Sequence, residues 1–191
     1  QLAKIDRNAK IGIRFSKIIN WVTNIKNKFF RILIQLIAGI DRRVVLPKYN
    51  SETFEQYSKN NFEQINKSAP AFGRKAIIYS TCFVNFNKKS TGIAALKVLK
   101  KNGIQVKHLY PGCCGMPYLE QADLTKVVEQ AKRVSNDLLS WIDKGYEIIT
   151  LTASCGLMLK FEWPLLLAND ENIKKLSSNV MDIDEYVVDI A

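Results

Sequence analysis

The segment Tyr110-Pro111-Gly112-Cys113-Cys114-Gly115-Met116-Pro117 places two adjacent thiols between residues that break helices and strands. Pro and Gly on both sides of the pair form turns, so the two cysteines are predicted to lie in a loop. The chain has two other cysteines, Cys82 and Cys155. Each closely follows a segment that is typical of a β-strand, whereas free cysteine usually packs as a small buried apolar residue.

Segments of strand type alternate with segments of helix type around this loop. The predicted strands are 76–80, 104–110 and 147–152, which are short and rich in β-branched and aromatic residues. The predicted helices are 92–101 and 119–144, which have apolar residues at helical spacing. Such alternation gives βαβ units with right-handed crossovers, so the predicted fold class is α/β with a parallel sheet.

The four cysteines are predicted to meet at one edge of this sheet. Cys82, Cys113, Cys114 and Cys155 follow three different predicted strands. The carboxyl ends of parallel strands share an edge, and ligands collect beyond that edge. The sequence therefore predicts four sulfur ligands in one place.

Several chemistries remain open for these sulfurs. Disulfides suit small secreted scaffolds, and a bridge between Cys113 and Cys114 would be strained. Unligated core cysteines are the simplest alternative. A cysteine nucleophile at Cys155 would need a base, and His108 is the only histidine. A metal site is favoured, because four sulfurs suffice for tetrahedral zinc or for an iron–sulfur cluster.

The positive charge of the chain is concentrated at its N-terminal end. Residues 1–50 hold eleven Lys or Arg and two Asp, whereas residues 51–191 hold seventeen Lys or Arg and sixteen Asp or Glu. A nucleic-acid-binding domain would more often carry the positive charge on its folded part. We therefore expect no nucleic-acid partner, and we expect the N-terminal arm to lie on an acidic surface.

The arm is predicted to contain one or two amphipathic helices over residues 9–40, broken near Thr23-Asn24. Lys and Arg interleave with Trp and Phe over residues 10–40, a composition typical of a helix that lies on anionic lipid. The most apolar run, 29–40, is too short to cross a bilayer. A membrane surface or a protein partner is the expected contact, and packing within the chain is the alternative.

These observations divide the chain into four parts. They are a basic helical arm (1–45), a connector (46–74), an α/β domain (75–178) and the start of a linker (179–191). The first residue is Gln1 and the last residues have the pattern of a helix in progress. We therefore expect a fragment of a longer protein.

Several blocks of sequence resemble the cysteine-rich (CCG) domain family, which includes iron–sulfur subunits of heterodisulfide reductase and glycolate oxidase. The blocks are 80–87, 98–104, 113–117, 154–160 and 162–164. The resemblance covers roughly residues 40 to 191, and Cys-Cys-Gly in this order is a specific signal.

The resemblance implies an electron-transfer subunit of a membrane-associated respiratory dehydrogenase, itself non-catalytic and used in anaerobic respiration. Such a protein passes electrons from a flavoprotein partner towards quinone or another acceptor. The resemblance also implies a peripheral position on the cytoplasmic side of the inner membrane. Relatives of this kind carry ferredoxin-like clusters upstream and a second CCG domain downstream, and neither is found in this sequence.

Residue by residue, the resemblance is incomplete. The family motif has Cys, then Cys-Cys, then Cys-x-x-Cys, and Cys82, Cys113, Cys114 and Cys155 match its first four positions. Met158 stands at the fifth position. The resemblance implies a 4Fe–4S cluster, of cubane or non-cubane type, on the four cysteines. Zinc in a structural docking module is the alternative.

Overall fold

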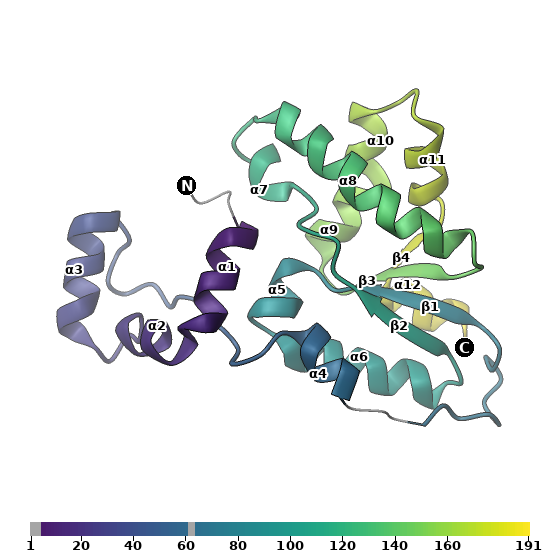
Figure 1. Ribbon diagram of the computed structural model, residues 1–191, viewed down its shortest axis with the longest axis horizontal. Helices are drawn as coiled ribbons and strands as arrows, with labels where there is room; N and C mark the ends of the chain where they lie inside the picture. Colours follow the sequence, from purple (N-terminus) through teal and green to yellow (C-terminus); the bar gives the residue numbers. More distant parts are fainter. Residues whose placement is uncertain (1–4, 61–63) are drawn as a thin grey trace.

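The chain has an N-terminal arm of helices beside an α/β domain (Figure 1). A computed structural model describes residues 5–60 and 64–191. The arm contains α1 (Ile5–Arg14), α2 (Ser16–Val22) and α3 (Lys28–Ala38). In Figure 1, α1 lies next to the domain and α3 lies furthest from it. The predicted break of the arm falls between α2 and α3, and a further break after Arg14 separates α1 from α2.

The domain is built on a parallel sheet with the strand order β2-β1-β3-β4. The strands are β1 (Lys75–Tyr79), β2 (Gln105–Leu109), β3 (Glu147–Thr150) and β4 (Val180–Asp182). The α/β fold class with a parallel sheet is confirmed. β1 is central and is buried from Ala76 to Tyr79, which explains its continuous apolar run.

The chain does not leave the domain at residue 178 as expected. β4 pairs with β3, with Val180 opposite Ile148, and α12 (Ile183–Asp189) follows. Tyr186 of α12 is fully buried, and its hydroxyl donates to Glu147 at 2.9 Å. Residues 179–191 are therefore part of the fold rather than the start of a linker. A strand of three residues is too short to show a period in the sequence.

Helices cover both faces of the sheet. One face packs against α4 (Phe54–Asn60), α5 (Cys82–Phe86), α6 (Lys89–Lys101) and α12. The other face packs against α8 (Leu124–Ile142), α9 (Ala153–Leu157), the π-helical turn η1 (Met158–Glu162), α10 (Trp163–Leu166) and α11 (Glu171–Ser177). The short α7 (Met116–Leu119) follows residues 110–115, the double-cysteine loop, which carries Cys113 and Cys114.

Capping residues explain where the helices depart from the sequence prediction. The helix expected over 119–144 begins later, at Leu124, because Asp123 caps α8 by accepting from the Lys126 amide at 3.3 Å. Cys82, expected in a loop, is the first residue of α5, and the Thr81 side chain caps that helix. Both caps satisfy amides that the first turn of a helix leaves unpaired.

Phe54 anchors the connector to the domain. Its fully buried ring packs edge-on against His108 and lies so close to Gly92 that a Cβ there would be 2.6 Å from it. We expect Phe54→Ala to lower the free energy of unfolding by about 3–5 kcal/mol, because the cavity cannot close fully. Urea denaturation measures this change. Phe29 is 71% exposed, so Phe29→Ala should change the same quantity by no more than about 0.5 kcal/mol. Equal effects of the two substitutions would contradict this packing.

Candidate functional site

The double-cysteine loop joins β2 to α7 and is held by two buried aromatic side chains. The Tyr79 hydroxyl, from β1, donates to the Gly112 carbonyl at 2.7 Å. The indole Nε1 of Trp163, from α10, donates to the Cys114 carbonyl at 3.0 Å. Gly115 has a φ of 91°, a left-handed conformation that lets the chain turn into α7. Both sides of the cysteine pair are therefore fixed by hydrogen bonds from different elements.

Strand order brings the other two cysteines to this loop. Cys82 begins α5 directly after the central strand β1, and Cys155 lies in α9 after β3. Cys113, Cys114 and Cys155 are buried in one cluster, and Cys82 is partly buried against it. The Cys114 thiol donates to the Cys155 sulfur at 3.3 Å. All four cysteines are free thiols, and they come from the segments that follow β1, β2 and β3 at the carboxyl edge of the sheet.

Cys82, Cys113 and Cys114 have pKa values that are shifted from the ordinary value of a thiol, and not all in the same direction. The pKa of Cys113 is lowered to about 3, because Cys114 and Cys82 donate to its sulfur, and the Gly115 amide and Arg133 add to this effect. The pKa of Cys82 is raised because its thiol is a donor to Cys113 and because it is buried. The pKa of Cys114 is raised by donation to Cys113 and Cys155 and by burial. The arrangement favours one thiolate among neighbouring thiols at neutral pH.

Arg133 and Asp6 are neighbours of the site that the sequence did not reveal. Arg133 of α8 lies so close to the loop that a Cβ on Gly112 would be 2.0 Å from its Nη2. Its Nη2 also donates to Gln130 at 2.6 Å and to Asp6 of α1 at 3.4 Å. The Tyr110 hydroxyl donates to the same Asp6 carboxylate. Since these residues are far apart in the chain and exposed or half-buried, no local pattern marks them.

The chemistry of the donor set fits a soft metal or an iron–sulfur cluster. Four free sulfurs face one another in a largely buried setting, and thiolate is the preferred ligand of zinc and of iron–sulfur clusters. Within residues 5–60 and 64–191, however, no three His, Cys, Asp or Glu side chains are arranged around a point in the way that a single metal ion requires. Cys114 and Cys155 contact each other directly instead.

Met158 is fully buried beside the cysteines and begins the π-helical turn η1. Short π-helical segments are frequent at functional sites. Thioether sulfur is a weak acceptor, so Met158 supplies apolar packing to the wall of the site.

The structure gives no support to a cysteine nucleophile that uses His108 as its base. The Nε2 atom of His108 is 2.8 Å from the Ser58 hydroxyl of α4. Its ring packs against Phe54, which belongs to the core on the other face of the sheet. Burial and nearby lysines lower the pKa of His108. This imidazole serves the contact between α4 and β2.

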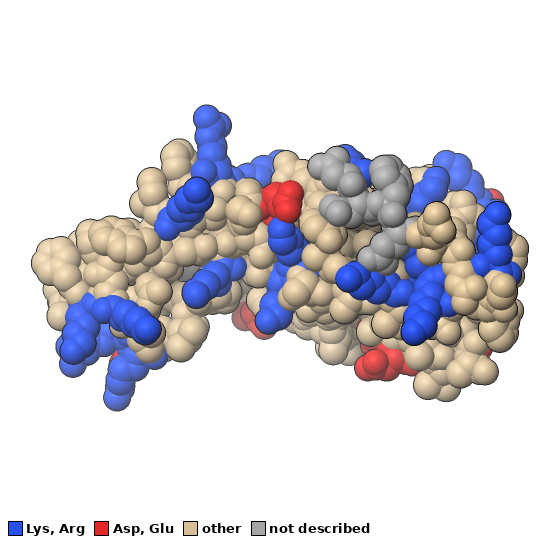
Figure 2. All heavy atoms as spheres, turned by 90° about the horizontal axis from the view of Figure 1, so that it is seen from below, with Lys and Arg blue, Asp and Glu red and all other residues tan. Residues whose placement is uncertain are grey.

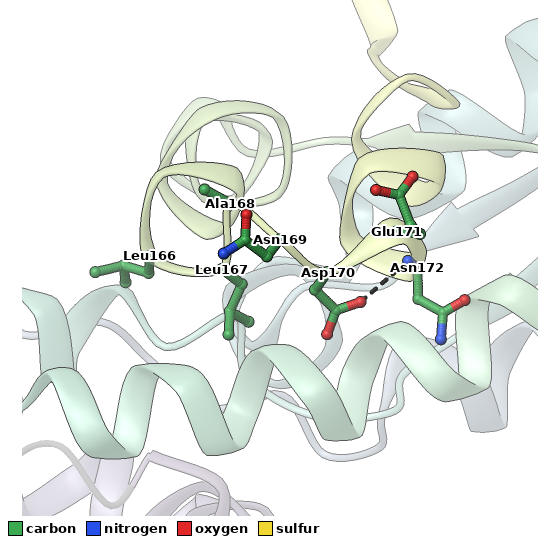
Figure 3. A pocket seen from close by; sticks show the side chains of 7 residues that line it. All are labelled: Leu166, Leu167, Ala168, Asn169, Asp170, Glu171 and Asn172. Atoms are coloured by element: carbon green, nitrogen blue, oxygen red, sulfur yellow. Dashed lines mark hydrogen bonds between the residues drawn. The ribbon is translucent and has the colours of Figure 1, made fainter.

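A hollow of about 530 Å³ lies away from the cysteines, where α10 turns into α11 (Figure 3). It is lined by residues 166–172. The Asp170 side chain accepts from the Asn172 amide at 3.0 Å and from the Ile173 amide at 3.2 Å, so it serves as the cap of α11. The shape of this turn accounts for the hollow.

Comparison with known proteins identifies the domain that holds the cysteines. Residues 76–160 match the family model of the cysteine-rich domain CCG. This segment is a CCG cysteine-rich domain. The match runs from β1 into η1 and includes Cys82, Cys113, Cys114 and Cys155. The resemblance noted from the sequence is confirmed.

Two of the curated relatives are named as components of redox complexes. The chain is 27% identical over 171 residues to one of the subunits of anaerobic glycerol-3-phosphate dehydrogenase of Escherichia coli (strain K12), covering 88% of this chain and 42% of the relative. It is 28% identical over 156 residues to one of the subunits of fumarate reductase (CoM/CoB) of Methanothermobacter marburgensis, covering 78% and 28%. It is 24% identical over 123 residues to lactate utilization protein A of Macrococcus caseolyticus, covering 61% and 47%. The chain therefore spans less than half the length of these relatives. No solved structure matches it.

Trp163 should stabilise the double-cysteine loop beyond its contribution to packing. We expect Trp163→Phe to lower the free energy of unfolding by about 1–3 kcal/mol, because the Cys114 carbonyl loses its indole donor in a buried place. Denaturant unfolding of the reduced protein measures this loss. Trp21→Phe alters an exposed tryptophan and should leave stability within about 0.5 kcal/mol. The role assigned to the indole would be wrong if the two variants were equally stable.

Proposed function

We propose that the chain is the electron-transfer part of an anaerobic dehydrogenase complex, similar to the matching part of anaerobic glycerol-3-phosphate dehydrogenase. In this proposal Cys82, Cys113, Cys114 and Cys155 hold a 4Fe–4S cluster. The observation that carries it is the meeting of four free sulfurs from the segments that follow three strands of a CCG domain. The names of two relatives, which are subunits of a dehydrogenase and of a reductase, agree with it.

A bound cluster would supply one-electron transfer between partner proteins. The chain's own residues have definable roles in this. Tyr79 and Trp163 fix the loop that carries two of the ligands. Arg133 places a positive charge beside Cys113, which stabilises negative charge on the sulfurs. Burial of Cys113, Cys114 and Cys155 keeps water away from them.

The electron donor in this proposal is a flavoprotein and the acceptor is quinone or another carrier. Support comes from the relatives, two of which are named as subunits of larger complexes. Zinc in a docking module is the second candidate. The donor set of four cysteines is compatible with it, because four thiolates also suit tetrahedral zinc.

Anaerobic purification of the chain tests the cluster directly. We expect iron with acid-labile sulfide, and an EPR signal in one redox state, because a 4Fe–4S cluster becomes paramagnetic on one-electron transfer. Cys114→Ser should lose most of the bound iron, whereas Ser154→Ala, beside Cys155 but exposed, should retain it. Stoichiometric zinc without iron would instead assign the docking role.

We also propose that the arm attaches the chain to the cytoplasmic face of the inner membrane. Large apolar side chains stand exposed on α2 and α3: Ile18, Trp21, Phe29, Ile32, Leu33, Leu36 and Ile37. Lys and Arg side chains lie beside uncharged surface at the end of the molecule where α2 and α3 lie (Figure 2). No helix within the described residues is long and apolar enough to span a bilayer. An interfacial contact uses both the apolar and the basic side chains.

The other end of the arm packs within the chain. Asn20 exchanges hydrogen bonds with the Tyr49 backbone at 2.8 and 2.9 Å, and Asp6 contacts Tyr110 and Arg133. The alternative of internal packing thus describes α1 and part of α2, and the exposed surface of α3 remains for the membrane.

Leu36→Asn should weaken binding to phosphatidylglycerol vesicles by about tenfold or more, because burial of a leucine side chain is lost. Leu36 is 79% exposed, and Val188, in the α/β domain, is 77% exposed. Val188→Asn is therefore the matched control and should leave binding unchanged. Vesicle flotation measures both. Equal binding of the two variants would place the membrane contact elsewhere.

A further inference from the structure

A second candidate binding site lies in the arm, between α3 and the chain that follows it. This hollow, which we call the arm pocket, has a volume of about 390 Å³. It is lined by Ile25, Lys28, Arg31, Ile32, Arg42 and Arg43. Four of its six lining residues are cationic. It is remote in the sequence from every cysteine.

Arg31 lines the arm pocket and is unusual for a cation because it is only 1% exposed. Its Nε donates to the Arg42 carbonyl at 3.3 Å, and its Nη2 donates to the Asp41 and Val44 carbonyls at 2.9 and 2.8 Å. Its Nη1 has no hydrogen-bond partner. A buried guanidinium needs both its donors and its charge satisfied, so this arrangement is costly without an anion.

The carboxylate of the same loop does not supply that anion. Both oxygens of Asp41 are bonded to Arg43, with Nε at 3.1 Å and Nη2 at 2.9 Å. These hydrogen bonds lower the pKa of Asp41 to about 2, so it is ionised at neutral pH and already paired. Lys28, Arg31 and Arg42 then leave the arm pocket with an excess of positive charge.

We propose that the arm pocket binds the phosphate group of an anionic phospholipid. Phosphate oxygens accept paired hydrogen bonds from guanidinium groups, which matches the free Nη1 of Arg31 and the neighbouring Arg42. Ile25 and Ile32 line the pocket and are themselves exposed, so the lipid's apolar portion meets apolar side chains. The inference rests on the membrane contact proposed above. It adds a specific headgroup site to a general electrostatic attraction.

Arg42→Gln tests the arm pocket, because Arg31 bonds to the Arg42 carbonyl and not to its side chain. Lys28→Gln is a second variant that leaves every contact of Arg31 intact. Arg14→Gln is the matched control, since Arg14 is an exposed residue of the arm that does not line the pocket. Each of the three variants of the 191-residue chain loses one positive charge. Circular dichroism establishes that each is folded.

Binding to phosphatidylcholine vesicles with and without phosphatidylglycerol is the measurement. The control should bind anionic vesicles about fivefold more weakly than the wild type, as expected for one surface cation. Arg42→Gln and Lys28→Gln should each lose at least about tenfold more, because a charge-assisted hydrogen bond is also lost. Equal losses in all three variants, with the wild type still bound, would overturn the arm pocket and leave the membrane contact standing. If the wild-type chain failed to bind anionic vesicles, both the arm pocket and the membrane contact would be overturned.

Titration calorimetry with inorganic phosphate separates lipid from soluble phosphate. We expect no measurable binding of inorganic phosphate, because the apolar contacts of Ile25 and Ile32 are not used. The lipid assignment would be overturned if the wild type bound inorganic phosphate and Arg42→Gln abolished that binding without changing binding to vesicles. The arm pocket would then be a site for a soluble phosphate.

Discussion

The parallel pairing of β1 with β2 on one side and β3 on the other determines where every sulfur of the four cysteines lies. Each of the three strands ends at the same edge and is followed by a cysteine-bearing segment. The central position of β1 places the segment that begins with Cys82 between the ends of β2 and β3, and Cys114 of the double-cysteine loop contacts Cys155 directly. No cysteine needs a long-range contact of its own to reach the site, because the hydrogen bonds of the sheet have already brought the backbone there.

The strand ends set the position of the sulfurs, and buried side chains make that position rigid. Tyr79 and Trp163 each donate to a carbonyl of the double-cysteine loop, from different elements of the domain. Arg133 then sets the charge beside Cys113, and Asp6 ties Arg133 and Tyr110 to the arm. The arm is therefore joined to the edge of the sheet that carries the thiols. A membrane contact made by α3 would hold that edge at a defined distance from the bilayer.

The features that could be predicted from the sequence depend on local pattern. The apolar run of β1, the Gly and Pro residues around Cys113 and the helical period of α8 were sufficient for the fold class and for the meeting of the thiols. Features that depend on contacts distant in the chain were not predictable. The three-residue β4 is too short to show an alternating pattern of apolar residues. It forms because it pairs with β3, with Val180 opposite Ile148. Arg133 has the sequence context of an ordinary exposed helix residue, and the burial of Arg31 results from carbonyls that lie ten to thirteen residues further along the chain.

The claim on which the rest depends is that the four cysteines share one iron-containing group. Anomalous diffraction at the iron edge, from crystals grown under anaerobic conditions, tests it most directly. We expect an iron peak within bonding distance of Cys82, Cys113, Cys114 and Cys155, beside Met158 but without a bond to its sulfur. An absence of iron at this edge of the sheet, with Cys114 and Cys155 joined in a disulfide, would contradict the account.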